Sequence, residues 1–301
     1  MEANKTETTN IMTRAGLDFE VEKRPHYVRE LTEAGDHYNE SALSCAIIRT
    51  DTGEEIGDVS KTYAIAQYQE IAAPFVQAAY DGYLNFQKGG IINRGQKFYL
   101  EFETKQDTIH GEDLRRRIIV GGSHDGSWAL FFKTFVWRQV CSNGMMGFGL
   151  QDTFRVRHTT NWKESYNGVI RQLQQTDVFY NRAMEKYNAM FDVKIDLPRM
   201  RELTRKLLEI DDKEAASSRK QNQLVDIISL THRGRGIIGN NQIQGTVAAW
   251  YNAVVEYVDH HSIQSTGSQR QNLNEKRFMS AFFGSGEDRK KKAFELAESL
   301  I

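Results

Sequence analysis

Residues whose types could do chemistry are most concentrated in the middle of the chain. Between 114 and 171, nine lysines and arginines stand against three aspartates and glutamates, with aromatic residues interleaved. Cations neutralise phosphates and exposed rings stack on bases, so this mixture is typical of proteins that bind single-stranded nucleic acid. The candidate phosphate contacts here are Arg115, Arg116, Arg117, Lys133, Arg138, Arg155, Arg157, His158 and Lys163. The candidate base-stacking residues are Trp128, Trp137, Phe154 and Trp162.

These residues also have a plainer interpretation. Adjacent strands about 4.8 Å apart could align the cations into one groove, and a following helix would add its N-terminal amide groups. Charged residues on an outer strand can equally be solvated, and aromatic residues that alternate along a strand often belong to the core. The sequence leaves both interpretations open.

Ser123, His124 and Asp125 have the residue types of a hydrolase triad. Three consecutive side chains point in different directions, however, whereas a triad needs groups that converge from separate parts of the fold. Since Gly126 follows, the sequence predicts a tight turn here. No catalytic residue is expected at this position.

A glycine-rich motif at residues 234–239 matches G-x-G-x-x-G. It lacks the strand–helix–strand setting that a dinucleotide site requires, so we interpret it as a loop between helices. Arg233 and Arg235 on this loop are further candidate phosphate contacts.

Metal-ligand patterns are sparse. Glu256, His260 and His261 are close in sequence, but two ligands on one helix face need a third from elsewhere, and none stands out. A metal-dependent nuclease would need clustered carboxylates, and Asp107, Glu112 and Asp113 lie close together, but an exposed loop is the more plausible interpretation of these residues. We therefore expect no metal and no cofactor.

Charge is distributed unevenly along the 301 residues. The total is −1, but residues 1–60 hold 6 basic and 13 acidic side chains. An acidic N-terminal region therefore precedes the basic segment. The polar start lacks a signal-peptide h-region, and two distant cysteines, Cys45 and Cys141, predict no disulfide framework. These features favour a protein of the cytoplasm, with no membrane association.

The hydrophobic pattern predicts an α+β fold with an antiparallel sheet. Strands are predicted at 42–50, 56–65, 96–106, 115–122 and 127–140. Helices are predicted at 68–86, 159–191, 196–210, 219–230, 246–260, 275–282 and 287–300. The order β-β-α-β-β-β-α followed by helices separates the two element types. We expect an irregular acidic region (1–40), an α+β core domain (41–195) and a helical C-terminal region (196–301).

The stretch GGSHDGSWALFFKTFVWRQVCSNGM (121–145) resembles the signature of an uncharacterised family of phage and plasmid proteins, known as a domain of unknown function (DUF932). Further matching stretches lie at 17–28, 46–67, 245–261 and 282–300. The resemblance implies a mobile genetic element in a bacterial host and carries no known catalytic residues. The order of elements is also similar to the core of single-strand annealing proteins such as RecT and Red-beta.

Together these features predict a non-catalytic protein that binds single-stranded DNA, or RNA, and promotes annealing and recombination. Such proteins act as rings or filaments, so a homo-oligomer is expected. The alternative is an interaction factor that acts on a host protein, and an enzyme on nucleic acid is a distant third.

Overall fold

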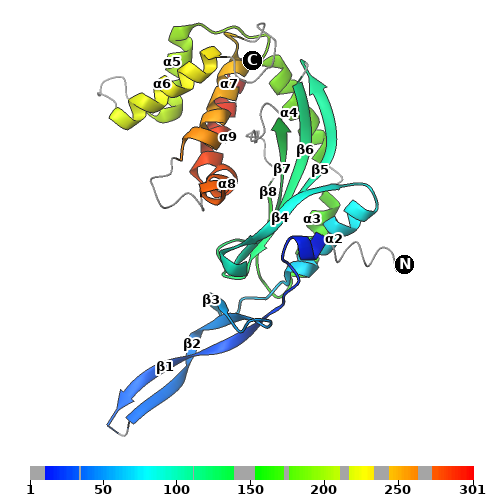
Figure 1. Cartoon of the computed structure of the whole chain (residues 1–301), viewed down its shortest axis with the longest axis vertical. Coiled ribbons are helices and arrows are strands. Elements are labelled where there is room, and N and C mark those ends of the chain that lie inside the picture. The colour runs from blue at the N-terminus through cyan, green and yellow to red at the C-terminus, as the bar shows by residue number, and fades with distance from the viewer. Residues whose placement is uncertain are drawn as a thin grey trace. The chain divides into compact units, whose positions relative to one another are not determined.

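The computed structural model describes residues 11–33, 35–110, 112–138, 153–172, 176–210, 217–233, 244–263 and 273–301. The chain forms two compact units (Figure 1). Unit 1 comprises residues 1–104, 117–134 and 152–176, and unit 2 comprises residues 105–116, 135–151 and 177–301.

Unit 1 contains a three-stranded antiparallel sheet of β1 (Val21–Thr32), β2 (Gly35–Arg49) and β3 (Glu55–Ser60). The end of β2 from Cys45 to Ile48 is buried because β1 and β3 flank it there and its apolar side chains join the core. The beginning of β2 pairs with β1 alone, and this part of the hairpin extends away from the other elements of the unit (Figure 1).

The second sheet has five strands. They are β4 (Asn85–Ile92), β5 (Lys97–Ile109), β6 (Glu112–Ser123), β7 (Leu130–Arg138) and β8 (Thr153–Val156), with a short 3₁₀ turn, η1 (Asn93–Gly95), after β4. Each strand lies beside the next one along the chain, so β4 and β8 form the two edges. Phe98, Leu100 and Phe102 alternate into the core as predicted, and the core also includes residues of α2 (Tyr68–Tyr80) and α3 (Trp162–Gln172). Gln67 and Glu70 form a capping box that fixes the start of α2.

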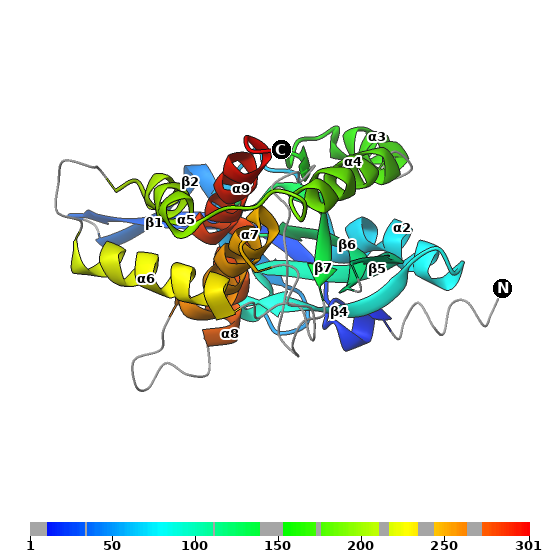
Figure 2. The same cartoon turned by 90° about the horizontal axis from the view of Figure 1, so that it is seen from above.

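Unit 2 is mainly helical. Its helices are α4 (Thr176–Ala189), α5 (Leu197–Leu208), α6 (Ser218–Arg233), α7 (Val247–Glu256), the π-helix η4 (Tyr257–His261), α8 (Leu273–Phe283) and α9 (Ser285–Glu298). Helix α7 is buried almost throughout and lies against α9 in both views (Figures 1 and 2). Asp196 and Thr246 cap α5 and α7 through their side chains, at the starts that the sequence predicts.

The α+β class with antiparallel sheets and C-terminal helices is confirmed. The expectation that residues 1–40 are irregular is wrong from Val21 onward, because β1 and β2 pair along a long hairpin. The single helix predicted at 159–191 is α3 followed by α4. The predicted division at residues 40 and 195 stays a prediction. Within the described part of the chain, no helix is long and apolar enough to cross a membrane.

Candidate functional site

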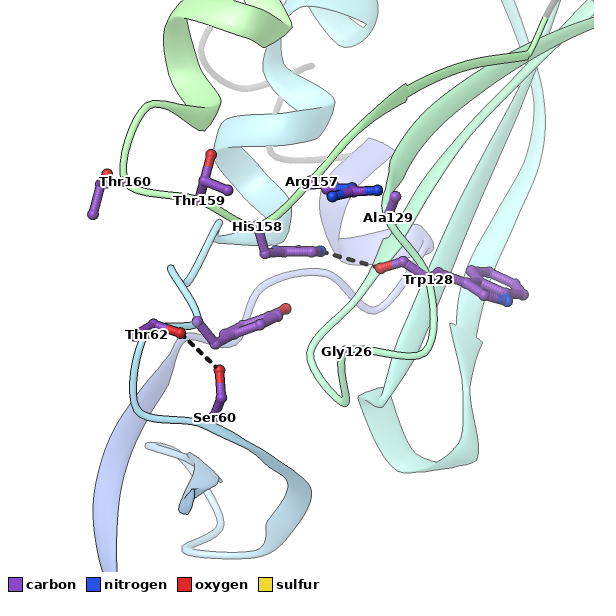
Figure 3. A pocket seen from close by; sticks show the side chains of 10 residues that line it. Ser60, Thr62, Gly126, Trp128, Ala129, Arg157, His158, Thr159 and Thr160 are labelled. Carbon is purple, nitrogen blue, oxygen red and sulfur yellow. Dashed lines mark hydrogen bonds between the residues drawn. The ribbon is translucent and has the colours of Figure 1, made fainter. Parts of the chain in front are cut away.

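Three connecting segments of unit 1 enclose a pocket of about 510 Å³, which we call the β8–α3 pocket. One segment ends β3 and leads toward α2, the second joins β6 to β7, and the third joins β8 to α3 (Figure 3). The lining residues are Ser60, Thr62, Tyr63, Gly126, Trp128, Ala129, Arg157, His158, Thr159 and Thr160.

His158 holds the three segments together. Its Nδ1 lies 3.3 Å from the carbonyl oxygen of Ala64, and its Nε2 lies 3.2 Å from that of Trp128. The backbone carbonyl of His158 accepts a hydrogen bond from the amide of Ala64 (3.1 Å), and the ring of Tyr63 stacks on the imidazole with centroids 4.5 Å apart. Burial lowers the pKa of His158, although the two carbonyls act in the opposite direction. The neutral imidazole can donate to only one of the two carbonyls.

The segment between β6 and β7 is fixed by its own side chains. The carboxylate of Asp125 accepts hydrogen bonds from the amide and hydroxyl of Ser127 (2.9 and 2.6 Å) and from Lys97 Nζ (2.9 Å). Burial would raise the pKa of Asp125, but these donors hold it below its ordinary value. Gly126 has φ +71°, a conformation that suits glycine. The turn predicted from the sequence is therefore confirmed.

The same segment buries an imidazole. His124 is fully buried and stacks on Tyr68 with ring centroids 3.8 Å apart. Among the described residues, neither of its ring nitrogens has a hydrogen-bond partner. Burial lowers the pKa of His124 to about 3. Ser123 bonds instead to the backbone of Trp128, so His124, Ser123 and Asp125 do not form a triad.

Positive charge reaches the pocket from the edge strand. Arg155 on β8 and Arg157 just after it are exposed, and neither forms an ion pair within the part of the chain that the structure describes. In Figure 3 the side chains of Arg157 and Trp128 extend to one side of His158, while Thr159 and Thr160 lie on the other side. Lys163 in the first turn of α3 is exposed and pairs with Glu70 at 2.6 Å. The pocket lining thus combines the guanidinium of Arg157 with hydroxyl groups and a half-exposed indole, and Arg155 and Lys163 lie on the neighbouring elements.

The cations of β6 and β7 do not extend this surface. Successive side chains of a strand point to opposite faces, so Arg116 and Arg117 cannot line one groove. Arg117 is buried and donates to the fully buried Glu101. Arg116 is also buried, lies 3.4 Å from the centroid of Tyr180 and donates to Asp107 at 3.1 Å. Lys133 is 2% exposed.

Arg115 is half-buried. The groove expected from the strand cations does not form, because Arg116, Arg117 and Lys133 are buried, and Arg115 as a phosphate contact stays a prediction.

The residues predicted to stack on bases differ in their surroundings. Trp162 is buried in the core beside Tyr166, and Phe154 stacks on Phe132 with centroids 4.5 Å apart. Both therefore serve packing, as the plainer interpretation holds. Trp128 alone among the described candidates reaches the pocket. The side chains of Trp137, Arg138 and Arg233, and the whole of Arg235, lie outside the described residues.

Other acidic and histidine clusters are engaged elsewhere. Asp107 pairs with Arg116, and Asp113 accepts a hydrogen bond from Thr108 at 3.3 Å, so these carboxylates do not converge as a metal pair. His261 lies 4.0 Å from Glu256, without a third ligand in the described structure.

Sequence reasoning missed the hydroxyl groups and the aromatic ring that complete the pocket. Ser60, Thr62 and Tyr63 come from the end of β3, far from the basic segment in sequence. The hydroxyl groups of Ser60 and Thr62 are 3.1 Å apart, and the Tyr63 hydroxyl donates to the Ser123 carbonyl at 2.7 Å. A run of Ser, Thr and Tyr residues after a strand was the available signal, but only the fold places it beside His158.

Comparison with known protein families gives one match. The model of a family described as a domain of unknown function, DUF932, matches residues 55–281. The chain belongs to this family. The family match includes every residue that lines the β8–α3 pocket, and it excludes β1, β2 and helix α9. Searches of the curated proteins and of the solved structures found no match.

Proposed function

We propose that this chain is a non-catalytic protein of phages and plasmids that binds single-stranded DNA at the β8–α3 pocket. Its role would be to promote strand annealing in recombination. The observation that carries the proposal is the placement of Arg157 and Trp128 on one side of His158, in a pocket also lined by threonine hydroxyl groups.

Each group has a defined part in this proposal. Arg155 and Arg157 neutralise phosphates, since both are exposed. Trp128 offers a ring face to a base, which is a contact that tolerates any base sequence. Thr159 and Thr160 precede α3, where hydroxyl and amide groups bind phosphate oxygens.

Two further features support an annealing role. The similarity to RecT and Red-beta rests on a predicted order of hairpin, helix, three-stranded meander and long helix. The structure has a hairpin, α2, an antiparallel sheet and α3 in that order, with five strands in the sheet. The resemblance of residues 121–145 to phage and plasmid proteins supports the association with mobile genetic elements. Annealing also needs no chemical step, only neutralised phosphates and accessible bases.

The experiment is a binding titration with labelled single-stranded DNA, duplex DNA and RNA of equal length at low salt. Arg155→Glu/Arg157→Glu should weaken binding to the single strand at least tenfold, because both phosphate contacts are lost and two repulsions are added. The matched control is Arg182→Glu/Arg201→Glu, which makes the same charge change at exposed positions on α4 and α5. Absence of binding by the unmodified chain, or equal weakening by both double variants, would overturn the proposal.

A further inference from the structure

The far part of the β1–β2 hairpin, residues 27–40, is an exposed two-stranded ribbon, which we call the arm. Every described side chain from Tyr27 to Leu31 and from Asp36 to Glu40 is exposed. Strand β3 pairs only with the part of β2 from Ser44 onward, so the arm has no third strand. A two-stranded ribbon is at best marginally stable in water by itself, and a covered face would stabilise it.

The register of the arm sorts its side chains onto two faces. Residues directly opposite each other share a face, and the faces alternate along each strand. Tyr27 pairs with Glu40, Arg29 with Tyr38, and Leu31 with Asp36. These six residues therefore lie on one face, which we call the aromatic face. Val28 with Asn39 and Glu30 with His37 form the opposite face.

The aromatic face collects three of the large apolar side chains that the chain exposes. Tyr27 is 60% exposed, Tyr38 62% and Leu31 79%. They are interleaved on two paired strands, so they form one patch instead of scattered single residues. Such contiguous apolar patches mark interaction sites. The opposite face has only Val28 as a large apolar residue, beside the Asn39–Glu30 hydrogen bond.

The charges on the aromatic face indicate what covers it. Arg29 pairs with Asp36 at 2.8 Å, and Glu40, opposite Tyr27, pairs with Lys61 at 2.7 Å. Each cation at this face is matched by a carboxylate, so the face has no excess of positive charge to attract a polyanion, which argues against nucleic acid. The same mixture is self-complementary: a two-fold axis can bring Arg29 of one copy to Asp36 or Glu40 of the other while the rings pack between them.

We infer that the aromatic face of the arm binds the same face of a second copy of this chain. The contact is isologous, with Tyr27, Leu31 and Tyr38 as its apolar centre and the charged side chains around them. This inference does not depend on the proposed nucleic-acid function, since the arm and the β8–α3 pocket share no residue.

The test is sedimentation velocity on the full chain from low to high micromolar concentration. The unmodified chain should associate reversibly, and Leu31→Glu or Tyr38→Glu should each raise the dissociation constant roughly tenfold or more, because each places an extra charge in the apolar centre. Val28→Glu is the matched control, on the opposite face of the same arm at 59% exposure, and should leave association unchanged. Circular dichroism of each variant shows that the fold is retained.

The outcomes separate this inference from the proposed function. Arg155→Glu/Arg157→Glu should bind DNA weakly yet associate normally. A monomer at all concentrations would overturn the inference and point to another protein on the aromatic face. Association that survives Leu31→Glu/Tyr38→Glu, or an equal loss with Val28→Glu, would overturn it as well.

Discussion

At the scale of single residues, His124 makes stability depend on pH. Its pKa is about 3 in the folded chain, below the ordinary value near 6.5, because its imidazole is buried. Below pH 6.5 the unfolded chain takes up a proton that the folded chain does not. The contribution of neutral His124 is therefore present above about pH 6.5 and is lost as the pH falls toward 3.

We expect His124→Phe to reduce this loss. Phenylalanine keeps a ring on Tyr68 and has no nitrogen that can be protonated, so the free energy of unfolding should fall less steeply between pH 6.5 and 4. Urea denaturation at a series of pH values measures the slope for both proteins. His158, with a pKa lowered in the same direction, remains in both and leaves a residual slope. Equal slopes for the two proteins would contradict this account of His124.

Lys290 is a second residue whose environment the sequence did not reveal. Runs of lysine such as Lys290–Lys292 on α9 are usually a solvated helix face, yet Lys290 is 1% exposed and its Nζ lies 2.9 Å from a carboxylate oxygen of buried Asp259. Burial raises the pKa of Asp259 to about 6, although Lys290 opposes the rise. Asp259 therefore favours the folded state below about pH 4, and this contribution is lost as the pH rises through 6.

Lys290→Met should destabilise the fold by about 3–5 kcal/mol at pH 7, because a buried carboxylate loses its cation. The loss should be smaller at pH 4, where Asp259 is protonated. Lys292→Met on the same helix removes the exposed pair with Glu209 and should leave unfolding nearly unchanged. Chemical denaturation of the two variants at both pH values is the measurement. Similar losses in both variants would show that the Asp259–Lys290 pair is not buried in solution.

At the scale of elements, β3 packs closely against the segment that joins β6 to β7. A side chain at Gly57 would place its Cβ 2.9 Å from the Asp125 Cα and 2.9 Å from the His124 carbonyl oxygen. Gly57→Ala should therefore push the two elements apart and cost about 1–3 kcal/mol. Urea denaturation should show the corresponding fall in the free energy of unfolding.

The control for that prediction is Gly168 on α3. An added Cβ there meets nothing within 4 Å. Gly168→Ala should stabilise the chain by up to about 1 kcal/mol, because alanine favours the helix. If Gly57→Ala unfolds no more easily than the unmodified chain, β3 does not press against the β6–β7 segment as the structure places it.

Sequence patterns predict some of these elements and miss others. The alternation of Phe98, Leu100 and Phe102 predicts β5 because the strand buries one face, and the caps at Asp196 and Thr246 predict two helix starts because their chemistry is local. The arm escaped prediction because neither of its faces is buried, so its hydrophobic residues follow no period-two pattern. The pocket was half predicted: Arg157 and Trp128 belong to the basic segment, whereas Ser60 and Thr62 join it only through tertiary contacts.

At the scale of the whole molecule, the near-zero net charge is the sum of an acidic region and a basic region. The first 60 residues are acidic in total. Among the described residues of the basic segment, exposed cations lie around β8 and α3, while Arg116 and Arg117 pair with carboxylates. We therefore expect copies to meet through the arm and nucleic acid to bind at the β8–α3 pocket, two functions that separate variants can test.

The most direct test of the central claim is the salt dependence of single-stranded DNA binding. The logarithm of the association constant should fall linearly with the logarithm of salt concentration, by about 0.7 for each phosphate neutralised. Arg155→Glu/Arg157→Glu should make this slope shallower by about 1.4, the loss of two contacts, whereas Arg182→Glu/Arg201→Glu should leave it unchanged. A slope unaffected by Arg155→Glu/Arg157→Glu would contradict the placement of nucleic acid at the β8–α3 pocket.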